Sequence, residues 1–280
     1  MQFTKVHGNG NDFIVIDNRK TRHTTEELSR FARLLCRRKF SIGADGVLVV
    51  EDAEGLDFTM RIFNADGSEG EMCGNGARAL ARYAFEKKMG GSDMCFTTLA
   101  GPIRARVEPP CAELDMGELD LTRGSFGKTL SLHGVEFSYD FLTVGVPHCV
   151  LFVGDYDATD ADLKVRIGRE VSHDFSLFPE GSNVSFAQVL SRSEIRAVTC
   201  ERGVDDLTES CGTGCVAIAV ASALRGEGAI SAPLAFRVHN PGGTNEVRLN
   251  FSPDKTSCRA WLKGRTAIVA EGEIFEDAWL

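Results

Sequence analysis

The chain has 280 residues, 43% of them apolar and 25% charged, which is ordinary for a globular protein with one large domain or two of about 140 residues. Its net charge of −9 argues against binding to nucleic acid or to an anionic membrane surface, because both repel an acidic protein. No apolar run approaches the ~18 residues of a membrane span, and the N-terminus lacks the pattern of a secretory signal. We therefore expect a cytoplasmic protein.

The nine cysteines predict neither a disulfide framework nor a metal site. Their number is odd, their spacing is irregular, and no Cys-x-x-Cys pair occurs. Cys211 and Cys215 form one Cys-x-x-x-Cys, but no second pair completes a zinc set. The sequence also lacks a pyridoxal or nucleotide fingerprint, so we expect reduced thiols, no metal and no cofactor.

The first half of the chain alternates predicted strands with two predicted helices. A helix is expected over residues 24–35, because Thr24 and Glu27 match a capping box. A second helix is expected over residues 77–89, where Gly90 ends it. The predicted strands of this half are residues 3–6, 13–17, 47–50 and 58–63.

The second half repeats this alternation. Residues 95–145 are rich in predicted strands, with turns at 101–102 and 133–134, and a strand–turn–strand unit is centred on Pro147-His148. Helices are predicted over 160–171 and 215–225. The remaining predicted strands are residues 183–189, residues 194–200 and the segments on either side of a turn at 241–243.

An internal repeat links the two halves. Residues 72–81 read MCGNGARALA and residues 210–219 read SCGTGCVAIA, so Cys73 and Cys211 lie 138 positions apart (211 minus 73), nearly half the chain. Each motif precedes an apolar helical stretch. Chance is the alternative reading, but the matched context favours a duplication. We therefore predict an α+β fold of two pseudo-symmetric domains, residues 1–120 and 121–265, each a mixed sheet or barrel wrapped around a central helix.

The repeated motif suits a pair of acid and base groups. Glycines and a helix N-terminus offer free N–H donors to an anion and lower the pKa of a cysteine held there. Two such cysteines facing one ligand suit inversion of a stereocentre, in which a thiolate removes the Cα proton and a thiol returns one to the other face. A lone cysteine before a helix is more often inert, and the repeat is what favours chemistry for Cys73 and Cys211.

The sequence resembles the diaminopimelate epimerase family along nearly its whole length. The segments that carry the resemblance are KVHGNGNDFIVID at 5–17, IGADGVL at 42–48, RIFNADGSEGEMCGNGARALARY at 61–83, PHCV at 147–150, FPEGSNVSF at 178–186 and ERGVDDLTESCGTG at 201–214. The resemblance implies interconversion of LL- and meso-diaminopimelate in lysine and peptidoglycan precursor biosynthesis, a small amino-acid substrate and a homodimer. It also implies that the C-terminal strand, residues 266–280, packs onto the first domain.

The same resemblance assigns roles to individual residues. Cys73 and Cys211 are expected as the acid and base, with His148 and Glu201 tuning the thiols. The residues expected to bind the substrate are Asn11, Asn64, Gly74, Asn75, Asn183, Glu201, Arg202, Gly212 and Thr213. Taken alone, Asn11 and Asn64 read as turn residues, His148 as a core histidine, and Glu201-Arg202 as a surface pair.

Three departures from the family pattern concern the substrate pocket. Val146 stands where many members have Asn, Gly46 where some have Gln, and Leu207-Thr208-Glu209-Ser210 where Glu-Thr-Leu-Ala is usual. Glu209 would raise the pKa of Cys211 if it pointed inward. The alternatives that stay open are a racemase of another amino acid such as histidine, a thiol redox protein, and a module that only binds an amino acid.

Overall fold

The computed structural model describes residues 1–226 and 233–279. They form two compact units, Met1–Asp115 with Gly264–Leu280 and Met116–Lys263. The chain passes from one unit to the other inside two strands, β8 (Cys111–Asp120) and β17 (Ser257–Glu273), and not through a linker. The division expected from the sequence fell at 120/121 and 265/266, a few residues further along each strand.

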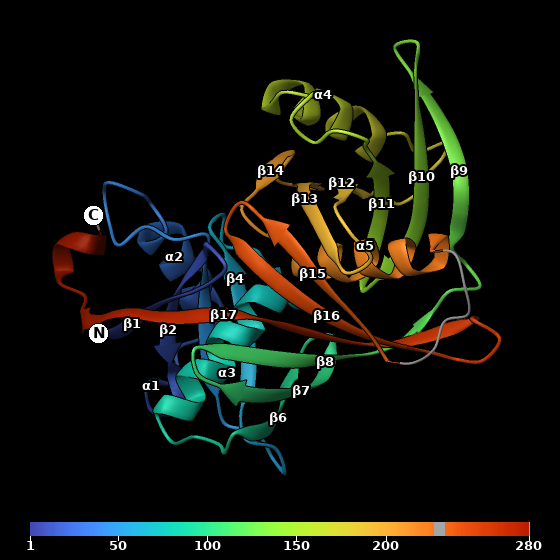
Figure 1. The fold of residues 1–280 in the computed structure, drawn as a ribbon. Coiled ribbons are helices and arrows are strands. Elements are labelled where there is room, and N and C mark those ends of the chain that lie inside the picture. The colour runs from blue at the N-terminus through green and yellow to red at the C-terminus, as the bar shows by residue number, and fades with distance from the viewer. Residues whose placement is uncertain (227–232, 280) are drawn as a thin grey trace. The chain divides into compact units, whose positions relative to one another are not determined.

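The first unit is a mixed sheet with helices on both faces (Figure 1). Besides parts of β8 and β17, its strands are β1 (Gln2–Gly8), β2 (Asn11–Asp17), β3 (Gly46–Glu51), β4 (Thr59–Asn64), β5 (Glu69–Gly70), β6 (Asp93–Thr98) and β7 (Gly101–Glu108). Its helices are α1 (Asn18–Thr21), α2 (Thr25–Leu35), α3 (Gly74–Glu86) and the 3-10 turn η1 (Glu276–Trp279).

The second unit is built in the same way. Its further strands are β9 (Ser125–Leu132), β10 (Val135–Val144), β11 (Val146–Phe152), β12 (Asn183–Val189), β13 (Glu194–Glu201), β14 (Asp206–Thr208), β15 (Leu234–Asn240) and β16 (Gly243–Phe251). Its helices are α4 (Ala161–Ser172) and α5 (Gly212–Arg225).

The two units share one topology. In the first, β1–β2 is antiparallel, β2–β3 parallel, β3–β4 antiparallel and β4–β6 parallel. In the second, β10–β11 is antiparallel, β11–β12 parallel, β12–β13 antiparallel and β13–β15 parallel. The antiparallel hairpins β6–β7 and β15–β16 then follow. The repeat predicted from the two motifs is therefore a repeat of the whole fold, and the α+β prediction is confirmed.

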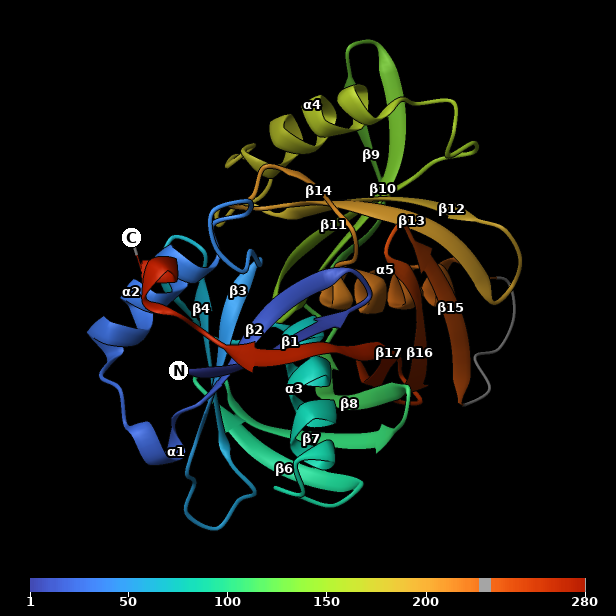
Figure 2. The ribbon, with the colours of Figure 1, turned by 90° about the vertical axis from the view of Figure 1, so that its left-hand side faces the viewer.

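One buried helix forms the centre of each unit. Strands β1, β2, β4 and β7 contact α3, as Figure 2 shows, and strands β10, β11, β12, β15 and β16 contact α5. The other face of each sheet is covered by α2 in the first unit and by α4 in the second. Ala217, Ala219, Ala221 and Ala223 of α5 are all buried, and such small side chains let strands approach a helix from several sides.

Both central helices begin three residues before their predicted starts. The helices were expected at 77 and 215, yet α3 starts at Gly74 and α5 at Gly212. Cys73 and Cys211 have extended backbones and act as N-caps, so the glycines form the first helical turn. At the other end α3 stops at Glu86, before Gly90, because Lys88 adopts a left-handed conformation (φ 56°).

The turn expected at Pro147-His148 was wrong. Gly145 (φ 70°) makes the turn, and both residues lie inside β11, where they pair with Thr143 and Leu142 of β10. Gly takes a positive φ at little steric cost, so it fixes the turn two residues earlier than the proline suggested. Helices α1 and η1 were not predicted.

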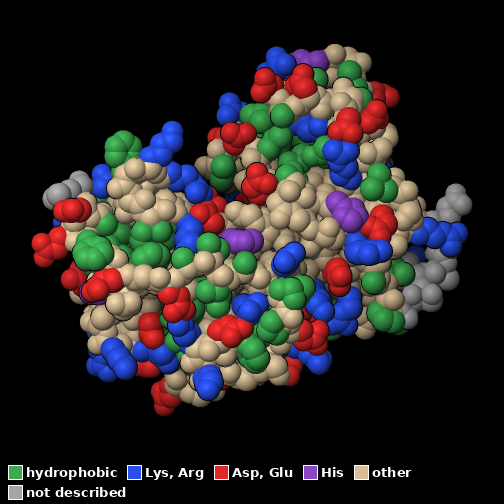
Figure 3. Space-filling model, turned by 60° about the vertical axis from the view of Figure 1, so that its left-hand side comes forward, with side chains coloured by type: hydrophobic (Ala, Val, Ile, Leu, Met, Phe, Trp, Pro, Cys, Tyr) green, Lys and Arg blue, Asp and Glu red, His purple; other side chains and the backbone are tan. Residues whose placement is uncertain are grey.

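Among the described residues no helix is long and apolar enough to cross a membrane. The face drawn in Figure 3 mixes acidic and basic side chains.

Candidate active site

Cys73 caps α3 in the first unit. Its backbone is extended (φ −136°), and the Gly76 N–H donates a hydrogen bond to its Sγ at 3.5 Å. Gly74 and Gly76 are buried in this first turn, and a Cβ added to Gly76 would lie 3.0 Å from Leu48 Cδ2. The thiol is partly exposed and lies at the positive end of the helix dipole.

Two asparagines meet at this thiol. The Cys73 S–H donates to Asn11 Oδ1 at 3.6 Å, and Asn75 Nδ2 donates to the same oxygen at 3.4 Å. Asp45 accepts a hydrogen bond from Asn11 Nδ2 at 2.7 Å, which turns Oδ1 of the amide toward Cys73. The structure therefore brings Asn11, Cys73 and Asn75 together.

Asn64 has a different surrounding. It is exposed at the end of β4, its Nδ2 donates to Ser68 Oγ at 3.0 Å, and its carbonyl accepts the Gly67 N–H at 2.8 Å. The sheet register pairs Asn64 with Gly46 and Gly46 with Phe13, two residues after Asn11, so Asn64 and Asn11 lie at the same end of the sheet. Its turn contacts are those of the plain turn residue that the sequence also allowed.

Cys211 is the corresponding cap of α5 in the second unit. The side chain is 7% exposed, and its Sγ lies 3.6 Å from Thr213 Oγ1. Burial raises the pKa of Cys211 well above its usual value, the Glu201 carboxylate raises this pKa further, and hydrogen bonds from Thr213 and Gly214 act in the opposite direction. For Cys211 the expectation of a lowered pKa was therefore wrong, because burial outweighs the effect of the helix N-terminus.

Glu201 is the carboxylate that acts on Cys211, and Glu209 is not. Thr208 Oγ1 donates to Glu201 Oε1 at 2.6 Å and holds the carboxylate at the end of β13. Glu209 is exposed. Glu209, which departs from the family pattern, therefore does not raise the pKa of Cys211, whereas Glu201 does.

His148 is fully buried in β11. Burial, with a smaller effect of Arg202, lowers its pKa to about 3, so the imidazole is neutral near pH 7. Neither ring nitrogen has a hydrogen-bond partner among the described residues. His148 pairs with Asn183, and the neighbouring pair Val184–Cys200 places Asn183 opposite Glu201. These three polar side chains thus lie side by side at one end of three adjacent strands.

Asn183 and Arg202 are linked. Asn183 Oδ1 accepts the Arg202 N–H at 2.8 Å, and Asn183 Nδ2 donates to the Pro147 carbonyl at 3.4 Å. Arg202 is exposed, and its Nη1 donates to the carbonyl of Glu180. Within the described part of the chain no acidic side chain pairs with this guanidinium, which suits it to a carboxylate ligand.

The structure shows the surroundings of two residues that depart from the family pattern, Val146 and Gly46. Val146 is 36% exposed. It lies two residues before His148, just as Asn11 lies two residues before Phe13, so Val146 and Asn11 occupy equivalent positions in the two units. A Cβ added to Gly46 would lie 2.7 Å from the Phe63 carbonyl oxygen, so this backbone has no room for a longer side chain.

Sequence reasoning missed the residues behind the cysteines. Asp45 orients Asn11, and Arg78, fully buried in α3, donates from Nη2 to Asn75 Oδ1 at 2.6 Å. The available signal was an arginine among the apolar residues of a predicted helix. No group of three metal-ligating side chains occurs in the described residues.

Comparison with known proteins identifies the family. The model of the diaminopimelate epimerase family matches residues 3–122 and 141–257. The chain is 38% identical over 290 residues to diaminopimelate epimerase of Methanothrix thermoacetophila, covering 99% of this chain and 97% of that one. It is 41% identical over 242 residues to diaminopimelate epimerase of Moorella thermoacetica, covering 81% and 85%.

A solved structure supports the fold alone. A phenazine biosynthesis protein of the PhzF family from Bacillus anthracis superposes with a TM-score of 0.77 over 98% of this chain and 99% of that chain, at 14% identity. Two units with one topology, a cysteine capping the central helix of each, and the sequence matches lead to one conclusion: the chain belongs to the diaminopimelate epimerase family.

Proposed function

We propose that this protein interconverts LL- and meso-diaminopimelate by proton transfer at Cα, with Cys73 and Cys211 as the two bases. The observation that carries the proposal is the repeated placement of a cysteine as N-cap of a buried helix, once in each unit. A racemisation needs one base for each face of the carbon, and a duplicated fold supplies two. The named relatives supply the substrate.

The proton balance closes on the two thiols. A thiolate takes the Cα proton and becomes a thiol, while the opposing thiol gives a proton to the other face of the carbanion and becomes a thiolate. The raised pKa of Cys211 favours its thiol form, so we assign it as the acid in the resting enzyme and Cys73 as the base. For the reverse substrate the roles exchange.

The remaining residues bind the substrate and stabilise charge. The N–H groups of Gly74, Asn75, Gly212 and Thr213 suit the α-carboxylate, where negative charge develops in the transition state. Arg202 suits a second carboxylate, and Asn64 and Asn183 suit the distal amino-acid group. The Glu201 carboxylate tunes the thiol by raising the pKa of Cys211, and His148, which is neutral near pH 7, adds no positive charge that would lower it.

We further propose a cytoplasmic homodimer in lysine and peptidoglycan precursor biosynthesis. Two-thiol chemistry requires reduced cysteines, which a cytoplasm maintains. Light scattering after gel filtration tests the dimer.

Solvent exchange followed by NMR tests the reaction and the substrate together. The protein is incubated in heavy water, without added cofactor, with LL-diaminopimelate and separately with L-histidine, L-lysine and L-glutamate. We expect deuterium at Cα with inversion for diaminopimelate alone. Exchange on another amino acid instead would assign a sister racemase, and absence of exchange from folded, reduced protein would reject the proposal.

A further inference from the structure

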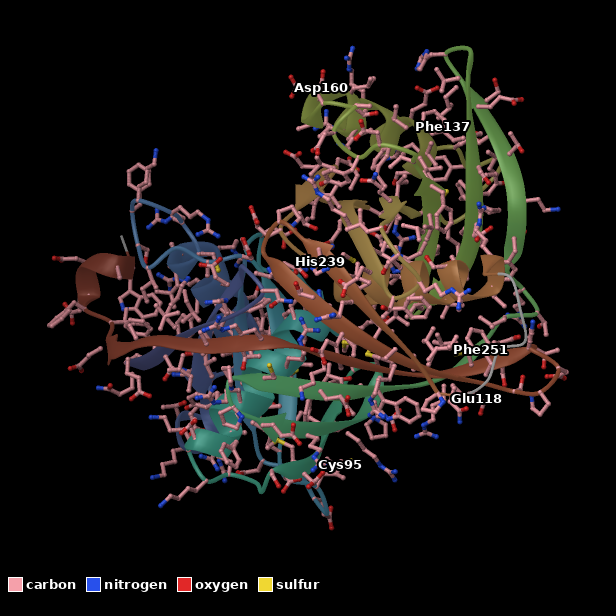
Figure 4. All side chains as sticks on the ribbon, in the orientation of Figure 1. Cys95, Glu118, Phe137, Asp160, His239 and Phe251 are labelled. Carbon is pink, nitrogen blue, oxygen red and sulfur yellow. The ribbon has the colours of Figure 1, made fainter. Side chains whose placement is uncertain are left out.

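A buried polar cluster lies behind Cys211, and three of its positions are apolar in the first unit. Its centre is Asn245, fully buried in β16, whose Nδ2 lies 2.9 Å from Ser210 Oγ, 3.1 Å from Asn240 Oδ1 and 3.3 Å from Cys215 Sγ. The Cys215 S–H donates to Asn240 Oδ1 at 2.9 Å, and Asn240 Nδ2 donates to the Ala197 carbonyl at 3.0 Å. His239, labelled in Figure 4, precedes Asn240 on β15.

The cluster holds the chain on both sides of the catalytic cysteine. Ser210 directly precedes Cys211, and Cys215 lies one helical turn after it, with its N–H donating to the Cys211 carbonyl at 3.0 Å. The β15–β16 hairpin also reaches this loop through Gly242, whose N–H donates to the Glu209 carbonyl at 2.8 Å. Asn245 therefore ties the approach to the helix and its first turn to one hairpin.

The repeat supplies an internal comparison. Subtracting 138 from positions 210 and 215 gives Met72 and Ala77 in the first unit. The hairpins β6–β7 and β15–β16 close on the pairs Thr98–Gly101 and Asn240–Gly243. Two residues beyond each glycine stand Ile103 and Asn245, so the first unit has Met72, Ala77 and Ile103 where the second has Ser210, Cys215 and Asn245.

The first unit shows that this fold does not require polar residues at these positions. Burying amide and thiol groups costs free energy that hydrogen bonds only offset, and a polar network fixes geometry more strictly than apolar packing. Asn240 has the polar Thr98 as its equivalent, but the other three polar residues stand where the first unit has apolar ones, which indicates a demand specific to Cys211.

We propose that Asn245 is a positioning residue for Cys211: its contacts fix the Ser210–Cys215 turn and hold Asn240, whose Oδ1 accepts the Cys215 S–H and so keeps Cys215 a thiol. The inference rests on the proposed function, in which Cys211 is one of the two bases. A second thiolate one turn from Cys211 would oppose its ionisation, so a neutral Cys215 leaves the proton transfer to Cys211.

Site-resolved alkylation tests this without any substrate. Iodoacetamide is added over a range of pH, and mass spectrometry of the separate peptides gives the rates for Cys211 and Cys73. The variant Asn245→Ile introduces the residue type that the first unit has at this position. Loss of the contacts frees the turn and exposes the buried thiol, so Cys211 should react at least about threefold faster relative to Cys73. The kcat should fall about 10²-fold, because the sulfur is misplaced. KM should stay within about threefold, since substrate binding is retained.

Two further variants make the test decisive. Asn18→Ala removes another buried asparagine, which donates to the His23 carbonyl at 3.1 Å and to Glu51 Oε1 at 2.8 Å, and should lower the melting temperature without changing the Cys211 to Cys73 ratio. If Asn245→Ile does not fold, Ser210→Met/Cys215→Ala/Asn245→Ile, which carries the whole apolar set of the first unit, replaces it.

A folded variant with an unchanged alkylation ratio and unchanged kcat would overturn the role of Asn245. So would Asn18→Ala if it changed the ratio as much. A failure of the two-base mechanism looks different: Cys211→Ala would then keep its turnover, while the effect of Asn245 on Cys211 alkylation would persist.

Discussion

At the scale of single residues, the two halves of the fold place different chemistry at equivalent positions. The parallel pairs Phe13–Gly46 in the first unit and His148–Asn183 in the second begin the same strand contact. The first unit puts apolar or small residues there, and the second puts a buried imidazole and an amide. Because Phe13 occupies the equivalent place without a polar group, the fold itself does not require His148.

A His148→Phe variant tests this directly. Folding lowers the pKa of His148 from its ordinary 6.5 to about 3. Between these two pH values the unfolded chain therefore binds a proton at His148 and the folded chain does not. This costs the wild type stability as pH falls from 6.5 toward 3. The variant should therefore lose less stability than the wild type over that range, measured as melting temperature against pH, and epimerase activity should fall. Equal loss of stability in both proteins would show that His148 is not held neutral by burial.

At the scale of elements, local sequence predicted some features and missed others for physical reasons. The capping box at Thr24 and the strands β12 and β13 were predicted, because hydrogen bonds of the cap and alternation along a strand are local. The starts of α3 and α5 were missed, since glycines followed by good helix formers suggest a loop until the cysteine is recognised as the cap. The contacts of Asp45 with Asn11 and of Asn245 with Ser210 join residues more than 30 positions apart, so no local pattern contained them.

The packing of α4 on its sheet gives an element-scale prediction. A Cβ on Gly168 would lie 2.5 Å from Cys200 Cβ and 2.8 Å from its Sγ, so the helix touches β13 through a glycine. Gly168→Ala should lower the free energy of unfolding by about 1–3 kcal/mol, because the helix must move away from the sheet. Gly154→Ala, with nothing within 4 Å of the added carbon, is the control. Urea denaturation measures both, and equal stabilities would contradict the close packing.

At the scale of the whole chain, the last residues complete the first unit. β17 runs antiparallel to β1 from Gly8–Thr266 to Gln2–Glu273, and Ile274 and Trp279 pack with α2 in the apolar core of that unit. The family resemblance predicted this return of the C-terminal strand. Composition and periodicity did not, since a parallel or antiparallel partner hundreds of residues away leaves no local trace.

Removing residues 264–280 should therefore affect the two units unequally. β1 would lose its pairing with β17, and the apolar core of the first unit would lose the residues at the end of the chain that pack on it. The second unit would keep its strands up to Lys263. Hydrogen exchange measured by mass spectrometry should show lost protection in β1, β2 and α2, and little change in β12, β13 and α5. Equal loss in both sets would contradict the division into two units.

The two-base mechanism is the central claim, and single-thiol variants in heavy water test it most directly. Starting from LL-diaminopimelate, the wild type should produce meso product carrying deuterium at the inverted carbon. Cys73→Ala and Cys211→Ala should each lose about 10²–10⁴-fold of this inversion, because an acid or base is missing from one face, while circular dichroism shows an intact fold. Inversion at near the wild-type rate in either variant would contradict the account.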